Sequence, residues 1–233
     1  MNDKTECDIY FIQVPVETKE NGAQDIQQLE NALFEIPIDK PVFIRSTITP
    51  ETFNHISQIR GVRIYYMPEF LSDRTAVEDF ENQTLVCTCI GSKYEKSKQD
   101  ADLFRRVFAD RNIIEMSSME AILAKYIHNI FGALKVTYFN AVYDLARQLD
   151  SSYNNIIKCL VSTGHISKTY TDVPGHDGKR GFGGKCFDKD LRAFEKLFRY
   201  TRFGKIIEPI DKLNCEIRRN GCQHDEIKEA VNE

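Results

Sequence analysis

Short apolar runs alternate with amphipathic stretches through the first half of the chain. The apolar runs predict buried strands at residues 8–14, 41–45, 62–66, 84–90 and 112–116. Between them, apolar residues at helical spacing predict helices at residues 23–34 and 93–110, and another that begins at Pro50 with Thr49 as its N-cap. Strands that alternate with helices in this way predict a parallel βαβ sheet, placed here at residues 7–117.

The second half of the chain carries only helical patterns. From Ser118 to Leu149 the only glycine or proline is Gly132, which predicts one helix of about 30 residues. Further helices are expected at 153–162, after the capping candidates Asp150 and Ser151, and at 188–200 and 206–219. Residues 163–185 form the least regular stretch. The expected fold class is α/β, with a parallel sheet followed by an all-helical domain at residues 118–233.

The long helix carries more apolar residues than one small domain is expected to cover. This predicts that the helix is the spine of a symmetric homodimer. The apolar residues on which this prediction depends are Ile122, Tyr126, Ile130, Leu134, Phe139, Val142 and Leu145.

Composition narrows the class of protein. Of the 233 residues 42% are hydrophobic and 28% charged, which excludes a disordered chain. The net charge of -4 does not favour nucleic acid or an anionic membrane as a partner. No apolar run approaches the roughly 18 residues of a membrane span. The first residues lack the basic region and apolar core of a signal peptide, so a cytoplasmic location is expected.

The seven cysteines include no CxxC pair, which predicts reduced thiols and no metal site. Cys87 and Cys89 are expected to fill the core from one face of a strand. Cys186 differs, because it follows a glycine-rich turn in GFGGKCFDKD (residues 181–190), where a helix is expected to begin. The positive end of that helix, with Lys185 and Lys189, favours the thiolate, so Cys186 is a nucleophile candidate and the predicted most reactive thiol. An inert cysteine at a helix start is the alternative.

Three other groups are candidates for chemistry. Lys125 and Asn129 lie four residues apart on the long helix and could hold an oxyanion, or else form ordinary surface and interhelical contacts. Glu69 and Asp73 follow an expected strand end, where two carboxylates could serve as a base and a water-positioning group, or else cap a turn. Thr47 also follows a strand end and is either a site hydroxyl or a turn residue.

These motifs together resemble the UDP-glucose/GDP-mannose 6-dehydrogenase family. The resemblance is carried by STITP, PEFLSDRTAVEDF, AKYIHNIFGALKVTYFNAV and GFGGKCFDKDL in this order, and it covers nearly the whole chain. It implies a partial Rossmann-like sheet (1–117) and a helical central and dimerisation domain (118–233). It also implies that a CH₂OH group of a nucleotide sugar, foremost UDP-glucose, is oxidised to a carboxylate by two NAD-dependent hydride transfers through a thioester on Cys186.

The resemblance assigns further roles residue by residue. Lys125 and Asn129 stabilise the alkoxide, while Asp190, Thr47 and Glu69 orient or deprotonate water. Thr47, Asp73 and Lys189 contact the cofactor. The implied substrate-binding residues are Phe70, Leu71, Lys125, Asn129, Arg180, Phe182, Gly183 and Gly184.

The same resemblance sets expectations about what this chain lacks. The glycine-rich first half of the NAD-binding domain and the C-terminal nucleotide-binding domain are not found in the sequence, so NAD binding is expected to be weak or assisted by a partner chain. Lys168, Lys179 and Arg180 are phosphate candidates, with surface charge as the alternative. The alternative is a non-catalytic dimerising or binding module derived from the family. The departures at Asp73, Lys185 and Asp188 favour it, whereas the joint retention of the six proposed catalytic residues argues against it: Thr47, Glu69, Lys125, Asn129, Cys186 and Asp190.

Overall fold

The computed structural model describes residues 7–60, 63–71, 75–88, 95–184 and 186–218. The chain divides into two compact units, Met1–Ile127 and His128–Glu233. Cys89, Asp73 and Lys185, which entered the sequence predictions, lie outside the described residues.

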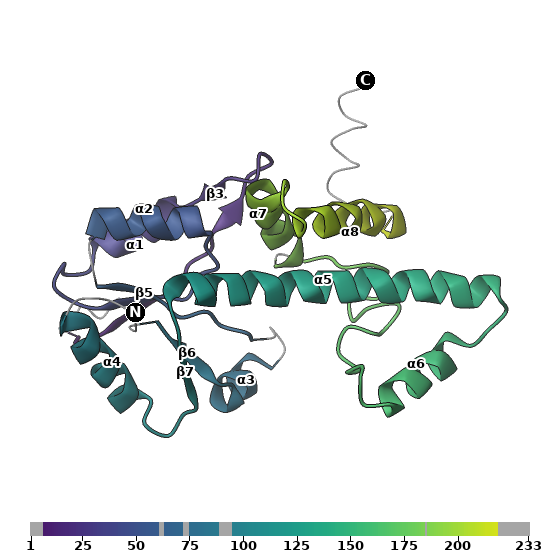
Figure 1. Ribbon diagram of the computed structural model, residues 1–233, viewed down its shortest axis with the longest axis horizontal. Coiled ribbons are helices and arrows are strands. Elements are labelled where there is room, and N and C mark those ends of the chain that lie inside the picture. Colours follow the sequence, from purple (N-terminus) through teal and green to yellow (C-terminus); the bar gives the residue numbers. More distant parts are fainter. Residues whose placement is uncertain (1–6, 61–62, 72–74, 89–94, 185, 219–233) are drawn as a thin grey trace. The chain divides into compact units, whose positions relative to one another are not determined.

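The first unit contains the expected parallel strands (Figure 1). Strands β1 (Tyr10–Ile12), β4 (Val42–Ile44) and β5 (Ile64–Tyr66) form a parallel sheet in the order β1-β4-β5. Strands β6 (Leu85–Cys87) and β7 (Ile113–Glu115) form a separate parallel pair. The strand predictions are confirmed, with each strand shorter than its apolar run.

The helices of the first unit follow the sequence pattern with two differences. They are α1 (Gln27–Phe34), α2 (Pro50–Arg60), α3 (Ala76–Asn82), α4 (Glu95–Val107) and the start of α5 (Ser118–Gln148). Helix α1 begins later than expected, because Gln24–Asp25 forms strand β3, which pairs with β2 (Glu17–Thr18). Helix α3 had no separate prediction. Thr49 is the expected N-cap, since its Oγ1 accepts the Thr52 N–H at 3.2 Å.

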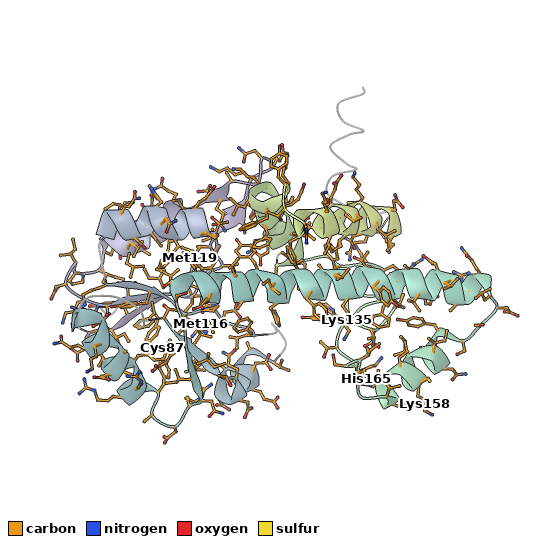
Figure 2. All side chains as sticks on the ribbon, viewed as in Figure 1. Cys87, Met116, Met119, Lys135, Lys158 and His165 are labelled. Carbon is orange, nitrogen blue, oxygen red and sulfur yellow. The ribbon has the colours of Figure 1, made fainter. Side chains whose placement is uncertain are left out.

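A single aromatic and aliphatic cluster joins the parallel strands to α4. Phe43 of β4 packs on Tyr65 of β5 and Phe104 of α4, with ring centroids 5.1 and 4.9 Å away. Cys87 of β6 is fully buried in the same cluster and is labelled in Figure 2. Its predicted role as a core residue is confirmed. The cluster stabilises the strands whose carboxyl ends carry candidate site residues.

A buried carboxylate ties α4 to β5. Asp100 is 1% exposed and accepts hydrogen bonds from Tyr65 Oη at 2.7 Å and Arg63 Nε at 3.0 Å. The hydrogen bond to Asp100 is the main reason that the pKa of Arg63 is raised above its usual value. Removing the carboxylate would leave both donors without their partner.

We therefore expect Asp100→Ala to lower the free energy of unfolding by about 3 kcal/mol. Urea unfolding monitored by circular dichroism measures this change. The control is Asp102→Ala on the same helix, where an exposed carboxylate pairs with exposed Arg105 and the expected loss is below about 0.5 kcal/mol. Equal losses in the two variants would contradict the assignment.

The second unit is helical, as expected. It contains most of α5, together with α6 (Tyr153–Ser162), α7 (Phe187–Phe198) and α8 (Gly204–Ile217). The predicted capping residues of α6 are wrong. Asp150 has a φ of +48° and terminates α5, while the Ser152 side chain accepts the Asn155 N–H at 3.3 Å and is the N-cap.

Helix α5 is a single helix of 31 residues, which confirms the predicted long helix (Figure 1). Most of the apolar residues chosen to predict its exposed surface are, however, buried within the chain: Ile122, Tyr126, Ile130 and Phe139 are at most 3% exposed. A long helix presents several stripes, and sequence alone does not tell which one faces the core. The exposed apolar residues of α5 are Leu123, Ile127, Phe131, Tyr138 and Leu145.

The long irregular segment after α6 is anchored to α5. Lys135 of α5 donates to the backbone oxygen of Ser167 at 2.7 Å and to its hydroxyl at 2.9 Å. Figure 2 labels Lys135 on α5 and His165 on this segment. Partial burial lowers the pKa of Lys135. These contacts fix the segment that leads to the glycine-rich turn.

Candidate active site

In the first unit, the structure brings together Lys125 and Glu69. Lys125 is 5% exposed, and its Nζ donates to the Glu69 backbone oxygen at 2.5 Å and lies 3.4 Å from Glu69 Oε1. The other carboxylate oxygen accepts the Leu71 N–H at 2.7 Å. Phe70 lies under the ammonium, 5.5 Å from Nζ. A buried cation and a fixed carboxylate thus share the carboxyl end of β5.

Arg45 adds a second cation near Glu69. It follows β4 and is half-buried, and burial lowers the pKa of its guanidinium while the Glu69 charge partly opposes that shift. Its Nε is buried and has no hydrogen-bond partner among the described residues. A buried donor of this kind fits a polar or anionic ligand at the carboxyl edge of the sheet, where dinucleotides bind in open α/β folds.

Thr47 lies in the turn after β4, and a glutamine that sequence reasoning missed holds this turn. Gln24 Nε2 donates to the Thr47 backbone oxygen at 3.1 Å, and its Oε1 accepts from Thr49 N and Thr52 Oγ1, both at 2.8 Å. Gln24 Nε2 also lies 3.3 Å from Tyr126 Oη. The pattern gave no signal for this role, because Gln24 was assigned to an amphipathic helix.

In the second unit, the structure brings together Asn129, Asp190 and Lys189. Asp190 is 1% exposed, and its Oδ2 accepts from Asn129 Nδ2 at 2.6 Å. Its Oδ1 accepts from Lys189 Nζ at 2.5 Å. Asn129 Oδ1 lies 3.0 Å from His128 Nδ1. The carboxylate is therefore held by a donor on each oxygen.

Cys186 occupies the N-cap position of α7, one turn before Asp190. Its backbone oxygen accepts the Asp190 N–H at 3.2 Å, and its side chain is exposed. A thiol at this position interacts with the positive end of the helix, which favours the thiolate. Cys159 of α6 is also exposed, whereas Cys87 is buried.

The glycine-rich turn before Cys186 is held by three polar residues that the sequence analysis did not select. Asn140 Oδ1 accepts the Gly181 N–H at 3.1 Å, and Asn214 bonds both the N–H and the carbonyl of Phe182, at 2.8 and 3.0 Å. Arg218 donates to the carbonyls of the turn and to Asp177. Asn214 is buried on α8 together with Ile207 and Ile210. A polar residue at a buried helix position is a sequence feature that could have pointed to this role.

Glycine is required at position 181 for two reasons. Gly181 has a φ of +68°, and a Cβ placed there would lie 2.5 Å from Asn214 Oδ1.

We expect Gly181→Ala to lower the free energy of unfolding by about 3 kcal/mol, because the substitution combines backbone strain with loss of the Asn214 contacts. Gly178→Ala is the matched control: its φ is +73° with nothing within 4 Å, so about 1 kcal/mol is expected. Thermal unfolding measures the loss of stability in each variant. Similar losses in the two variants would contradict the predicted clash with Asn214.

Two of the three phosphate candidates in this segment, Arg180 and Lys168, have side-chain partners within the chain. Arg180 pairs with Asp144 at 2.7 Å and lies over the Tyr143 ring, and Lys168 pairs with Asp172. The Lys179 backbone N–H donates to Asp177. Among the described residues, no group of three His, Cys, Asp or Glu side chains could hold a metal ion.

Both halves of the chain match one protein family. Residues 1–111 match the NAD-binding domain of the UDP-glucose/GDP-mannose dehydrogenase family, and residues 119–215 match its central domain. The chain belongs to this family. The NAD-binding match supports NAD as the cofactor of these nucleotide-sugar dehydrogenases.

Relatives extend the match over most of the chain. It is 25% identical to a UDP-glucose 6-dehydrogenase of Rickettsia felis, with 91% of this chain and 49% of the relative covered. It is 28% identical to a GDP-mannose 6-dehydrogenase of Pseudomonas aeruginosa, with 81% and 46% covered. A solved UDP-glucose dehydrogenase of Pyrobaculum islandicum has a TM-score of 0.72 at 26% identity, with 89% and 50% covered. The chain spans about half the length of these relatives.

No helix in the part of the chain that the structure describes is long and apolar enough to cross a membrane.

Proposed function

We propose that this chain carries out the NAD-dependent oxidation of a nucleotide sugar, of the UDP-glucose to UDP-glucuronate type, through a thioester on Cys186. The observation that supports this most is the presence of two polar pairs, Lys125 with Glu69 and Asn129 with Asp190, in a chain that matches both family domains. A non-catalytic module is not favoured, since the relatives that match about 90% of this chain carry enzyme names.

The first oxidation converts the CH₂OH group to an aldehyde. The alcohol loses its proton to solvent water, and the carbon loses a hydride. Lys125 and Asn129 are suited to stabilise the developing alkoxide, one by its charge and the other by its amide. Bound NAD⁺ supplies the hydride acceptor for each oxidation, with Thr47, Asp73 and Lys189 as the residues proposed to hold it.

Cys186 then prevents loss of the aldehyde. Its thiolate adds to the carbonyl carbon, a C–S bond forms, and the carbonyl electron pair moves onto oxygen. A second hydride leaves the same carbon, and the C=O bond re-forms as a thioester. Lys125 and Asn129 are again the proposed partners of the oxyanion.

Hydrolysis releases the acid. Asp190 accepts a proton from water, which attacks the thioester carbon, and the C–S bond breaks to return the thiolate. Thr47 and Glu69 are proposed to orient this water. Phe70, Leu71, Arg180 and the backbone at Phe182, Gly183 and Gly184 are proposed to bind the sugar nucleotide.

The test is a panel of nucleotide sugars incubated with the protein and millimolar NAD⁺, with NADH formation followed by absorbance. We expect UDP-glucose to give the highest rate, with GDP-mannose as the comparison. The panel is repeated with neighbouring gene products added, because a second chain is a proposed partner. Absence of NADH with every sugar in both arms would contradict the proposal.

We further propose a homodimer along the exposed stripe of α5. Phe131, Tyr138 and Leu145 recur every seven residues and are 54–61% exposed. Phe131→Lys with Tyr138→Lys is expected to weaken association at least about 100-fold, since each buried aromatic contributes roughly 2 kcal/mol. Sedimentation velocity measures this, with Tyr200→Lys, at a position 94% exposed, as the control. A wild-type monomer at micromolar concentration would refute the dimer.

A further inference from the structure

Tyr170 has an unusual backbone conformation close to Cys186. Its φ is +62°, in the left-handed region that costs a residue with a Cβ about 1–2 kcal/mol. Strain of this kind persists only where the surrounding structure holds it, and it is often found at functional sites. Tyr170 had no role in the sequence analysis.

The turn that carries Tyr170 is firmly anchored. Thr171 is fully buried, and its backbone N–H and hydroxyl both donate to the Lys168 carbonyl, at 3.2 and 2.7 Å. The Thr171 carbonyl accepts from Tyr153 Oη at 2.6 Å. Burial raises the pKa of Tyr153 to about 12, so this donor stays protonated. The anchors on Thr171 hold the adjacent strained residue in place.

The Tyr170 ring packs on the residue next to Cys186. Its centroid lies 5.4 Å from that of Phe187, the first residue of α7, with an interplanar angle of 71°. The Phe182 ring centroid lies 6.0 Å from that of Phe187, with an interplanar angle of 83°. Edge-to-face pairs at these distances are attractive. Two aromatic rings therefore pack on the first residue of α7.

The Phe187 and Tyr170 rings both pack against α5 at Gly132. A Cβ there would lie 2.6 Å from Phe187 Cζ and 3.3 Å from Tyr170 Cε2. The only glycine of the long helix thus lets both rings approach the helix backbone. It is a helix-destabilising residue at this position, and the close approach explains why it is present.

Tyr170 and Cys186 also interact electrostatically. Partial burial, and then the negative charge of an ionised Cys186, raise the pKa of the Tyr170 phenol, which is 42% exposed. One turn after Cys186, Lys189 and Asn129 donate to the Asp190 carboxylate.

We propose that Tyr170 is a positioning residue, whose ring packs on Phe187 over Gly132 and holds the Cys186 thiol at the N-terminus of α7. This deepens the proposed function and rests on it for the use of the thiol. The claim concerns the ring, so the phenolic hydroxyl is not needed.

Two variants separate the ring from the backbone and the hydroxyl. Tyr170→Phe keeps the ring, so the alkylation rate of Cys186 is expected to stay within about twofold of the wild type. Tyr170→Gly removes the ring but suits the positive φ, so it is expected to fold. Loss of positioning should lower the Cys186 rate near neutral pH by about three- to fivefold, because the helix terminus no longer favours the thiolate as strongly.

The measurement is mass-mapped iodoacetamide alkylation of Cys186 across a pH series, with exposed Cys159 as the internal control. The expected result is a pH midpoint that is shifted upward for Tyr170→Gly but not for Tyr170→Phe, with the rate recovered at high pH. Phe187→Leu removes the ring pair from the other side and should give the same shift, which keeps the test valid if Tyr170→Gly does not fold.

Two results would overturn the proposal. One is an unchanged Cys186 profile in the variants that lack the ring pair. The other is a Tyr170→Phe profile shifted as far as that of Tyr170→Gly, which would assign the effect to the hydroxyl. Alkylation needs neither NAD⁺ nor sugar, so failure of the NADH assay would remove the proposed function and leave this result standing.

Discussion

Replacing Cys186 by serine is expected to lower NADH formation from a nucleotide sugar by at least about a thousandfold. A serine hydroxyl lacks the ionised form that a thiol reaches at a helix N-terminus, so the covalent step and everything after it slow together. The wild-type and variant rates are compared in the same assay, at the same millimolar NAD⁺ concentration.

The control for this substitution is Cys159→Ser. Cys159 is exposed like Cys186 but lies on α6 with no candidate site residue beside it, so its substitution should leave the rate within about twofold. Similar rates for Cys186→Ser and the wild type would remove the thioester from the account.

Asp190→Asn is expected to slow turnover at least about 100-fold while leaving the thioester step intact. Asparagine keeps an acceptor for Lys189 but cannot take a proton from water. The acyl group should therefore accumulate on Cys186, where intact-protein and peptide mass spectrometry would detect it after incubation with NAD⁺ and the sugar.

Asp188→Asn is the matched control on the same helix. Asp188 accepts a hydrogen bond from Arg192 at 2.6 Å, and among the described residues no hydrogen bond joins its side chain to Asn129 or Lys189. It should neither slow turnover greatly nor trap an adduct. A trapped adduct in both variants, or in neither, would contradict the role of Asp190 in hydrolysis.

The sequence predicted the elements that bury a continuous apolar pattern. The parallel strands and the long α5 follow directly from runs of Val, Ile, Phe and Tyr and from the absence of helix breakers. Helix α3 was not predicted from the sequence. None of its residues is buried, so its sequence lacks the apolar periodicity by which a helix is recognised. The β2–β3 hairpin was missed because each strand has only two residues.

The candidate site was predictable where residue type carries chemistry. Lys125, Asn129, Cys186 and Asp190 were selected from motifs, and the structure places Asn129 and Asp190 in contact at 2.6 Å. The residues that hold these groups could not be found in the same way. Gln24 and Asn140 act through hydrogen bonds to backbone atoms of distant turns, and such pairings depend on tertiary structure rather than on local pattern.

The helix face of α5 shows the same limit. Its sequence contains enough apolar residues for both an inner and an outer stripe, and periodicity alone does not distinguish them. Burial assigns Tyr126 and Phe139 to the interior and leaves Phe131 and Tyr138 on the surface. The dimer proposal therefore now rests on different residues.

The central claim is that this chain oxidises a nucleotide sugar by four electrons through a thioester on Cys186. Its most direct test is the stoichiometry of the reaction with UDP-glucose, with NADH measured by absorbance and the sugar product by NMR. The account predicts two NADH and one uronate for each sugar consumed, with no free aldehyde. One NADH per sugar with aldehyde released, or no oxidation with any partner chain present, would contradict it.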